Sequence, residues 1–173
     1  LIRLTRSYRS TYEIVDFTRA MLPGGEQIIP FNRRGNKPVV AMYEDREDMH
    51  GEIVRNIHDL QQQGYQYTAI ICKTESECTE AYEALKDQIT MRKMTKNTPI
   101  FEKGTIIIPA YLAKGVEFDA VILYNASAEQ YHREAERKLF YTACTRAMHL
   151  LYAYAIGEVT PFISKIDPEL YEQ

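Results

Sequence analysis

Residues 105–124 read TIIIPAYLAKGVEFDAVILY, which is two apolar runs joined by a polar turn. The runs at 105–108 and 120–124 are continuously apolar and do not alternate with polar residues. A strand has this pattern when both faces of its sheet are covered by other elements. The stretch therefore predicts two buried strands in a layered α/β domain.

The rest of the chain alternates between strand and helix periodicity in the same way. Further strands are expected at 39–43, 68–72 and 150–154. Helices with an apolar stripe are expected at about 10–22, 45–63, 74–85 and 129–148. The first and third of these helices begin with pairs at capping-box spacing, Ser10 with Glu13 and Thr74 with Glu77. The alternation predicts a mainly parallel sheet with helices on both faces, whose working residues gather where loops meet the open edge.

Composition limits the classes of function. The chain has 173 residues, a length that suits one domain, and a formal net charge of −3, so any contact with nucleic acid has to be local. Its three cysteines form no CxxC pair and no metal-ligand spacing, which indicates buried, reduced thiols and no metal site. No apolar run is long enough to cross a membrane, and the sequence begins without Met. We expect a cytoplasmic protein without a membrane partner, and a fragment of a longer polypeptide.

Three segments carry residues that suit phosphate chemistry. The turn at 113–119 places Lys114 and Glu117 beside Gly115, either as solvated charges or as a loop that approaches a ligand. Arg146 comes late in the fourth predicted helix, where it either complements the helix dipole or offers a guanidinium fork to a phosphate. Arg9 stands before the first helix, either as an exposed side chain or facing a phosphate shared with the helix start.

Two nucleotide-binding patterns are absent from the sequence. It contains neither GxxxxGK[ST] nor GxGxxG. The chain by itself therefore cannot hold a nucleoside triphosphate in the manner of a P-loop.

The same segments, in this order, resemble motifs of UvrD/Rep-type superfamily 1 helicases. Residues 4–11 (LTRSYRST) resemble motif IV, residues 114–119 (KGVEFD) resemble motif V, and residues 137–147 (RKLFYTACTRA) resemble motif VI. Residues 70–77 lie where the family has its intermediate motif IVa. The resemblance extends from residue 4 to about residue 154. It implies the C-terminal RecA-like domain, called 2A, of such a helicase.

The resemblance implies roles for particular residues. Two RecA-like domains hold ATP and Mg²⁺ between them, and Arg9 and Arg146 match the catalytic arginines that reach the γ-phosphate. Gly115 and Glu117 join them as ATP-binding residues. The remaining ATP and Mg²⁺ ligands belong to an N-terminal RecA-like domain of the same polypeptide, so the fragment alone is expected to be inactive.

Other residues of the matching segments, Lys73, Thr74 and Lys114, are expected to bind nucleic acid, with single-stranded DNA as the ligand. Tyr111, which lies outside these segments, is expected to stack on a base.

Two departures from the family pattern refine the expectation. The usual Thr-x-His before motif V is replaced by Pro109 and Tyr111, and only a short basic segment separates Gln88 from Phe101, where processive helicases insert their 2B domain. We therefore expect residues 1–173 to form a single 2A domain without 2B, closest to the HelD (helicase IV-like) branch.

Three functions remain open. The first is part of an ATP-driven DNA helicase or translocase. The second is an RNA polymerase-associated ATPase that remodels or recycles transcription complexes. The third is an interaction domain that has lost ATP hydrolysis.

Overall fold

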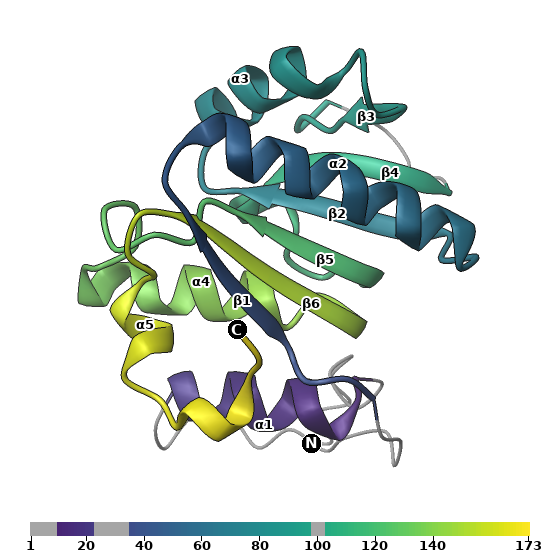
Figure 1. Cartoon of the computed structure of the whole chain (residues 1–173). Coiled ribbons are helices and arrows are strands. Elements are labelled where there is room, and N and C mark those ends of the chain that lie inside the picture. The colour runs from purple at the N-terminus through teal and green to yellow at the C-terminus, as the bar shows by residue number, and fades with distance from the viewer. Residues whose placement is uncertain (1–9, 23–34, 98–102) are drawn as a thin grey trace.

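The computed structural model describes residues 10–22, 35–97 and 103–173, and within them the strands form one sheet (Figure 1). The strand order is β1-β6-β5-β2-β4-β3, and each of the five neighbouring pairs is parallel. The strands are β1 (Val39–Tyr43), β2 (Tyr67–Cys72), β3 (Met91–Lys93), β4 (Gly104–Pro109), β5 (Phe118–Tyr124) and β6 (Ala147–Ile156). The predicted parallel α/β fold is confirmed.

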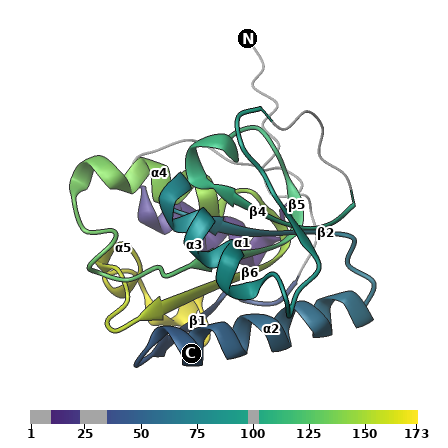
Figure 2. The same ribbon diagram turned by 90° about the horizontal axis from the view of Figure 1, so that it is seen from above.

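Helices cover both faces of this sheet. The α-helices are α1 (Tyr12–Met21), α2 (Arg46–Gln62), α3 (Glu75–Leu85), α4 (Arg137–Cys144) and α5 (Pro161–Ser164), and the 3₁₀ helices are η2 (Ala110–Leu112), η3 (Glu134–Glu136) and η4 (Pro168–Leu170). Helices α2 and α3 pack on one face, whereas α1 and α4 pack on the other. Figure 2 shows α2 and α4 on opposite sides of the sheet. None of the helices in the described residues is both long and apolar enough to cross a membrane.

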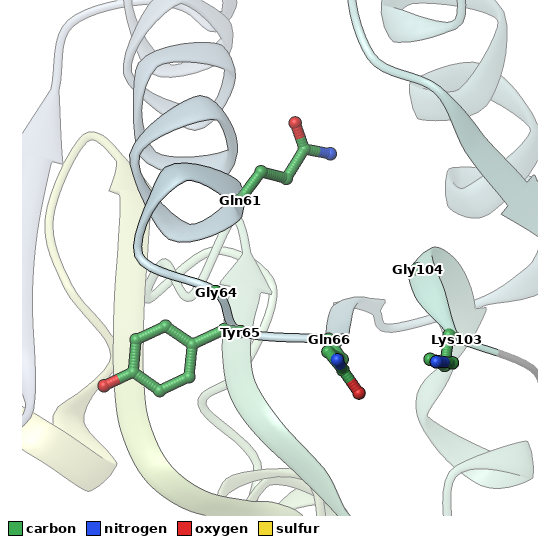
Figure 3. A pocket seen from close by; sticks show the side chains of 6 residues that line it. All are labelled: Gln61, Gly64, Tyr65, Gln66, Lys103 and Gly104. Atoms are coloured by element: carbon green, nitrogen blue, oxygen red, sulfur yellow. The ribbon is translucent and has the colours of Figure 1, made fainter.

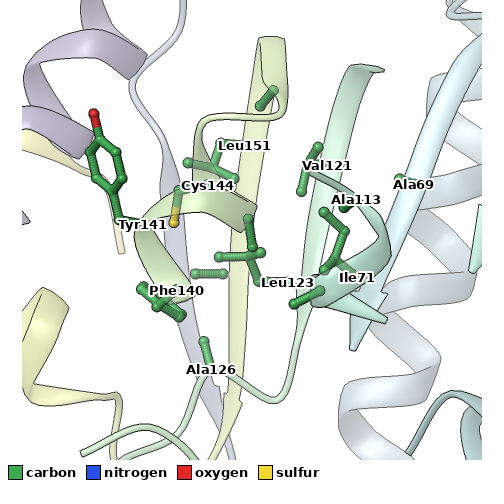
Figure 4. Close-up of a cluster of buried hydrophobic side chains, with 14 of the residues drawn as sticks. Ala69, Ile71, Ala113, Val121, Leu123, Ala126, Phe140, Tyr141, Cys144 and Leu151 are labelled. Carbon is green, nitrogen blue, oxygen red and sulfur yellow. The ribbon is translucent and has the colours of Figure 1, made fainter. Parts of the chain in front are cut away.

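Successive residues of the central strands belong to different layers of the core. In β5, Val121 and Leu123 join the cluster under α1 and α4, while Ala120 and Ile122 join the cluster under α2 and α3. Figure 4 shows part of the first cluster, including Val121 and Leu123 of β5 and Phe140 of α4. Because both faces of the central strands β2, β4 and β5 are largely buried, their apolar runs are continuous, as predicted.

The predicted apolar stripes of the first two helices are confirmed. Ile14, Phe17 and Met21 of α1 are at most 1% exposed, as are the four stripe residues of α2. The stripe residues of α2 are Met49, Ile53, Ile57 and Leu60. Two of the predicted helix boundaries also hold. Thr74 caps α3 by accepting a hydrogen bond from Glu77 N at 3.1 Å, and Gly64 follows α2 at φ +92°.

The capping box expected at the start of α1 is wrong. Thr11, not Ser10, caps this helix, accepting a hydrogen bond from Ile14 N at 3.4 Å. The Ser10 hydroxyl donates instead to the Ala147 carbonyl at 2.8 Å, and Glu13 accepts from Gly35 N at 2.7 Å. Tertiary partners have thus taken the two polar groups that the box would have used.

The helix predicted at 129–148 is also much shorter in the structure. Helix α4 ends at Cys144, and the chain enters β6 at Ala147, which pairs with Phe118 of β5. Pairing of β6 with both β5 and β1 outweighs the helical spacing of the small residues in this segment. Arg146 therefore lies in the connection between α4 and β6 and not within a helix.

A strand was missed in the segment predicted to be a basic loop. Residues 91–93 form β3 at the edge of the sheet, where Met91 pairs with Thr105 of β4. A three-residue strand with two cationic side chains has no detectable periodicity. Only its partner in β4 specifies it.

Truncation of a central β5 residue should destabilise the chain strongly. Ile122 is fully buried, so Ile122→Ala should lower the free energy of unfolding by about 2–5 kcal/mol. Met42 in the edge strand β1 is 54% exposed, and Met42→Ala should change it by less than about 0.5 kcal/mol. Urea denaturation of the 173-residue chain measures the free energy of unfolding of both variants. An equal decrease in the two variants would contradict this assignment of the core.

Candidate functional site

The predicted site residues lie at opposite ends of the strands. Glu117 directly precedes β5 and Arg146 directly precedes β6, whereas Lys73 follows β2 and Tyr111 follows β4. In a parallel sheet all amino ends share one edge and all carboxyl ends share the other. The structure therefore forms two groups, and the expectation that these residues gather at one open edge is wrong.

We name the two groups by the edge at which they lie. The amino-edge group contains Gly115, Glu117 and Arg146. The carboxyl-edge group contains Lys73, Thr74 and Tyr111. Lys114 is exposed in the turn that leads from η2 to β5, between the groups. Arg9 lies outside the described residues.

Arg146 occupies a buried junction between three elements. Its side chain folds back along the end of α4, where Nε donates to the Thr142 carbonyl at 3.0 Å and Nη2 donates to Thr145 Oγ1 at 3.1 Å. Nη1 lies 3.5 Å from the Val116 carbonyl, just before β5. The residue is only 9% exposed. The interaction expected of a cation at a helix end is therefore present, and it holds the guanidinium in one orientation.

The turn before β5 is hydrogen-bonded to the same junction. Gly115 has φ +85°, a left-handed conformation that favours glycine. Val116 N donates to the Ala113 carbonyl at 3.1 Å, and Phe118 N donates to the Arg146 carbonyl at 2.9 Å. Glu117 lies between Val116 and Phe118, whose backbone N–H groups make these hydrogen bonds, and its Oε2 atom is buried. The geometry thus places a carboxylate and a guanidinium in neighbouring segments of one edge.

The start of α1 lies beside the end of α4. Besides the bond from Ser10 to Ala147, Thr11 N donates to the Met148 carbonyl at 3.2 Å. At the other end of the pair, Arg137 Nη1 donates to the carbonyl of Met21 at 2.9 Å. The two helices are therefore antiparallel, and the residue after Arg9 is bonded to the residue after Arg146. Whether the two arginine side chains converge stays a prediction.

Tyr111 is the aromatic side chain of the carboxyl-edge group. It is 51% exposed, and its hydroxyl donates to Glu75 at the start of α3. Thr74 is adjacent in sequence to Glu75, and its hydroxyl caps α3. Pro109, which replaces the family's threonine, pairs with Cys72 as the last residue of β4. An aromatic ring thus lies half-exposed beside the ends of two strands.

Lys73 is engaged within the protein. Its Nζ lies 2.5 Å from Glu136 Oε2 and 2.6 Å from the Gln130 carbonyl, and 5.4 Å from the centre of the Tyr131 ring. Glu77 completes the network by accepting hydrogen bonds from Lys73 N and Gln130 Nε2, both at 2.8 Å. Sequence reasoning missed Glu77, Gln130 and Glu136, because Glu136 is separated from Lys73 by 63 residues and no spacing signals their contact.

Hydrogen bonds keep Glu136 ionised. Burial acts to raise the pKa of this carboxyl, but bonds from the Lys73 ammonium and from the backbone N–H groups of Arg133 and His132 outweigh burial and lower the pKa to about 2. Burial also raises the pKa of Glu77, although bonds from Lys73 N and Gln130 oppose it. The network therefore contains one firmly charged carboxylate.

Other features are not part of these groups. A hollow of about 400 Å³ opens at the amino ends of β2 and β4 (Figure 3), and it is lined by Gln61, Gly64, Tyr65, Gln66, Lys103 and Gly104. The three cysteines are buried, and burial raises the pKa of the Cys144 thiol. Within the described ranges, no three His, Cys, Asp or Glu side chains are grouped so that they could hold a metal ion.

The low pKa of Glu136 predicts a specific loss of stability in acid. Its folded pKa of about 2 is below the unfolded value of about 4.3, so the carboxylate stabilises the fold above pH 4.3, and this contribution is lost as the pH falls toward 2. Between these values the free energy of unfolding should fall more steeply in the unmodified chain than in Glu136→Gln. Denaturation as a function of pH measures the difference. Glu129→Gln, which removes one exposed carboxylate nearby, is the control, and equal slopes for all three proteins would contradict the prediction.

Comparisons with known proteins find helicase domains similar to this chain. Residues 106–154, which include Gly115, Glu117 and Arg146, match the UvrD-like helicase C-terminal domain. The crystal structure of the C-terminal domain of a possible DNA helicase from Lactobacillus plantarum WCFS1 is 37% identical, with a TM-score of 0.83. The similarity covers 96% of this chain and 98% of that one.

More distant structures are much less similar. The C-terminal domain of the DEAD-box protein Dbp5 is 10% identical, with a TM-score of 0.48, and the similarity covers 79% of this chain and 83% of that one. Escherichia coli DEAD-box protein SrmB gives the same identity and TM-score, over 82% and 92% of the two chains. Both TM-scores are too low to support a conclusion about this chain. No curated protein sequence matches the chain.

The matches identify the family but do not assign the chain to a branch of it. They do not address the HelD branch or the RNA polymerase-associated alternative, which stay predictions. The parallel sheet with helices on both faces is the RecA-like fold of helicase C-terminal domains. The 37% identity over nearly the whole length of both chains, together with the matching segment at 106–154, shows that this chain belongs to the family of UvrD-like helicase C-terminal domains.

Proposed function

We propose that this chain is the C-terminal motor domain of an ATP-dependent DNA helicase or translocase. In this proposal residues 1–173 are a single 2A domain, which forms one wall of an ATP site. The N-terminal RecA-like domain of the same polypeptide supplies the P-loop and the Mg²⁺ ligands. The observation that carries the proposal is the buried junction at which α4, β5 and β6 orient Arg146. Family membership and the relative described as a possible DNA helicase support it.

The amino-edge group suits one side of a phosphate site. A guanidinium held by Thr142 and Thr145 loses little conformational freedom when it meets an anion, and burial strengthens its electrostatic interaction. Gly115 lets the turn approach a ligand closely, and Glu117 offers an acceptor beside it. Arg9 is proposed as the second cation. Together these residues fit one wall of a nucleotide site, and the Mg²⁺ ligands come from the partner domain.

The chemistry of this wall is electrostatic. When ATP and Mg²⁺ are bound, the metal would neutralise part of the negative charge of the phosphates. Within this chain, Arg146 would place positive charge where negative charge grows on the γ-phosphate oxygens. Its fixed orientation means that no reorganisation is needed at that moment.

The carboxyl-edge group suits single-stranded DNA. The half-exposed ring of Tyr111 provides a stacking surface that tolerates any base. Thr74 lies in the same region at the start of α3. Lys114, which lies outside this group in the turn before β5, is proposed to contact the DNA backbone. A net charge of −3 fits a local contact surface of this kind better than a general attraction to phosphate.

Replacement of Arg146 should nearly abolish ATP hydrolysis by the full-length protein. We expect Arg146→Ala to lower the steady-state rate by about 10³-fold or more, because charge on the γ-phosphate is no longer stabilised. Arg146→Lys should also be strongly impaired, since an ammonium cannot reproduce the planar fork. Steady-state ATPase assays with saturating nucleic acid measure both.

Two controls accompany this test. Arg55 has a 68% exposed side chain on α2, on the opposite face of the sheet, and Arg55→Ala should keep full activity. The 173-residue chain by itself should show no Mg²⁺-dependent turnover. Full activity of a folded Arg146→Ala protein, or turnover by the isolated chain, would refute the shared site.

Removal of the Tyr111 ring should weaken binding of single-stranded DNA. Tyr111→Ala should cost roughly 1–3 kcal/mol of binding free energy in the full-length protein, whereas Tyr111→Phe keeps the stacking surface and loses only the bond to Glu75. Fluorescence anisotropy with a labelled oligonucleotide measures both affinities, and Met42→Ala controls for loss of another exposed side chain. Equal losses for the Ala and Phe variants would rule out stacking.

A further inference from the structure

Lys73 follows the last residue of β2, where a lysine that binds backbone phosphates would extend into solvent. Its ammonium points inward instead, to Glu136 at 2.5 Å and the Gln130 carbonyl at 2.6 Å. The side chains of the pair are only 22% and 12% exposed. To reach a phosphate, Lys73 would have to leave a mostly buried carboxylate without its cation, which is costly.

Glu136 caps the 3₁₀ helix η3, which runs directly into α4. Its Oε1 atom accepts hydrogen bonds from His132 N and Arg133 N, both at 3.0 Å, while Oε2 faces Lys73. The next residue, Arg137, is the first of α4. The carboxylate therefore closes the turn before the helix, and the ion pair attaches this turn to the end of β2.

The other end of α4 holds Arg146. The Thr142 carbonyl belongs to the last turn of the helix, and Thr145 is its C-cap, so both groups that orient the guanidinium move with α4. Eight helical residues span only about 12 Å. A segment this short behaves as a rigid rod, so a shift at its start reaches its end.

A second bond makes the start of α4 a shared anchor. Arg137 Nη1 donates to the carbonyl of Met21, the last residue of α1. At the other end of α1, Ser10 and Thr11 are bonded to Ala147 and Met148, which follow Arg146. Displacement of the α4 start would therefore disturb Arg146 both along α4 and through α1.

We infer that Lys73 is a positioning residue for Arg146, which it holds in place through Glu136 and α4, and is not a ligand of nucleic-acid phosphate. The inference rests on the proposed function, because it assumes that Arg146 acts on ATP. It replaces the expectation from sequence that Lys73 contacts nucleic acid.

The test compares Lys73→Met, Glu136→Gln and the double variant in the full-length protein. Each single variant should lower kcat for ATP about 10- to 100-fold, because small displacements of a catalytic group have effects of this size. The double variant should be no worse than either single variant, as expected when two residues act through one interaction. The KM for nucleic acid should stay the same.

The salt dependence of DNA binding separates positioning from phosphate binding. For single-stranded DNA, the slope of log affinity against log salt becomes shallower by about 0.7 for each phosphate that the protein no longer neutralises. Lys73→Met should leave this slope unchanged. Lys114→Met, which removes an exposed lysine of the proposed DNA surface, should make the slope shallower and so shows that the assay detects a single phosphate.

Two further variants guard against trivial loss of activity. Lys86→Met removes an exposed ion pair with Glu83 on α3 and should keep full activity. Lys73→Arg retains the cation and should recover part of kcat. The unfolding midpoint of each variant, measured on the 173-residue chain, establishes that it is folded at the assay temperature.

The outcomes distinguish the inference from the function on which it rests. A shallower salt slope with unchanged kcat in Lys73→Met would make Lys73 a phosphate ligand, and additive effects in the double variant would remove the link through Glu136. Either result overturns the inference while Arg146 keeps its proposed role. Absence of ATP hydrolysis by the unmodified full-length protein would instead refute the proposed function, and the inference would fail with it.

Discussion

Parallel hydrogen bonding of β5 to both β2 and β6 is the constraint on which the structure depends. Two paired edges place β5 inside the sheet, so both of its faces need apolar cover. Helices α1 and α4 cover one face, and α2 and α3 cover the other. Parallel pairing also separates the amino ends from the carboxyl ends, and this separation divides the candidate residues into two groups.

Helix α4 connects these two groups. It begins beside the Lys73–Glu136 pair near the carboxyl ends of the strands and ends at Arg146 near the amino ends. The antiparallel α1 lies against it: Met21 at the end of α1 accepts a hydrogen bond from Arg137 of α4, and Ser10 before α1 donates to Ala147, the first residue of β6. Under the proposed function the domain relates nucleic acid on one surface to ATP on another, and this pair of helices is the physical connection between the two surfaces.

The errors of prediction have one cause in common. The segment at 147–148 has helical spacing, yet it becomes strand because β5 offers it hydrogen bonds. Ser10 has the right spacing for a cap, yet its hydroxyl binds Ala147, 137 residues away. Residues 91–93 have no strand pattern, yet they pair with β4. In each case a distant partner outweighed a local preference.

The sequence by itself determined the elements whose signal is local. Continuous apolar runs specified the buried strands, and apolar stripes specified the inner faces of the helices. The ordered motifs indicated the helicase family. Each of these signals can be read from residues that are close together in the sequence. Only the tertiary structure decided which edge each candidate residue occupies and that Lys73 faces Glu136 instead of solvent. These are contacts between residues far apart in the chain, and their energies depend on how the layers pack.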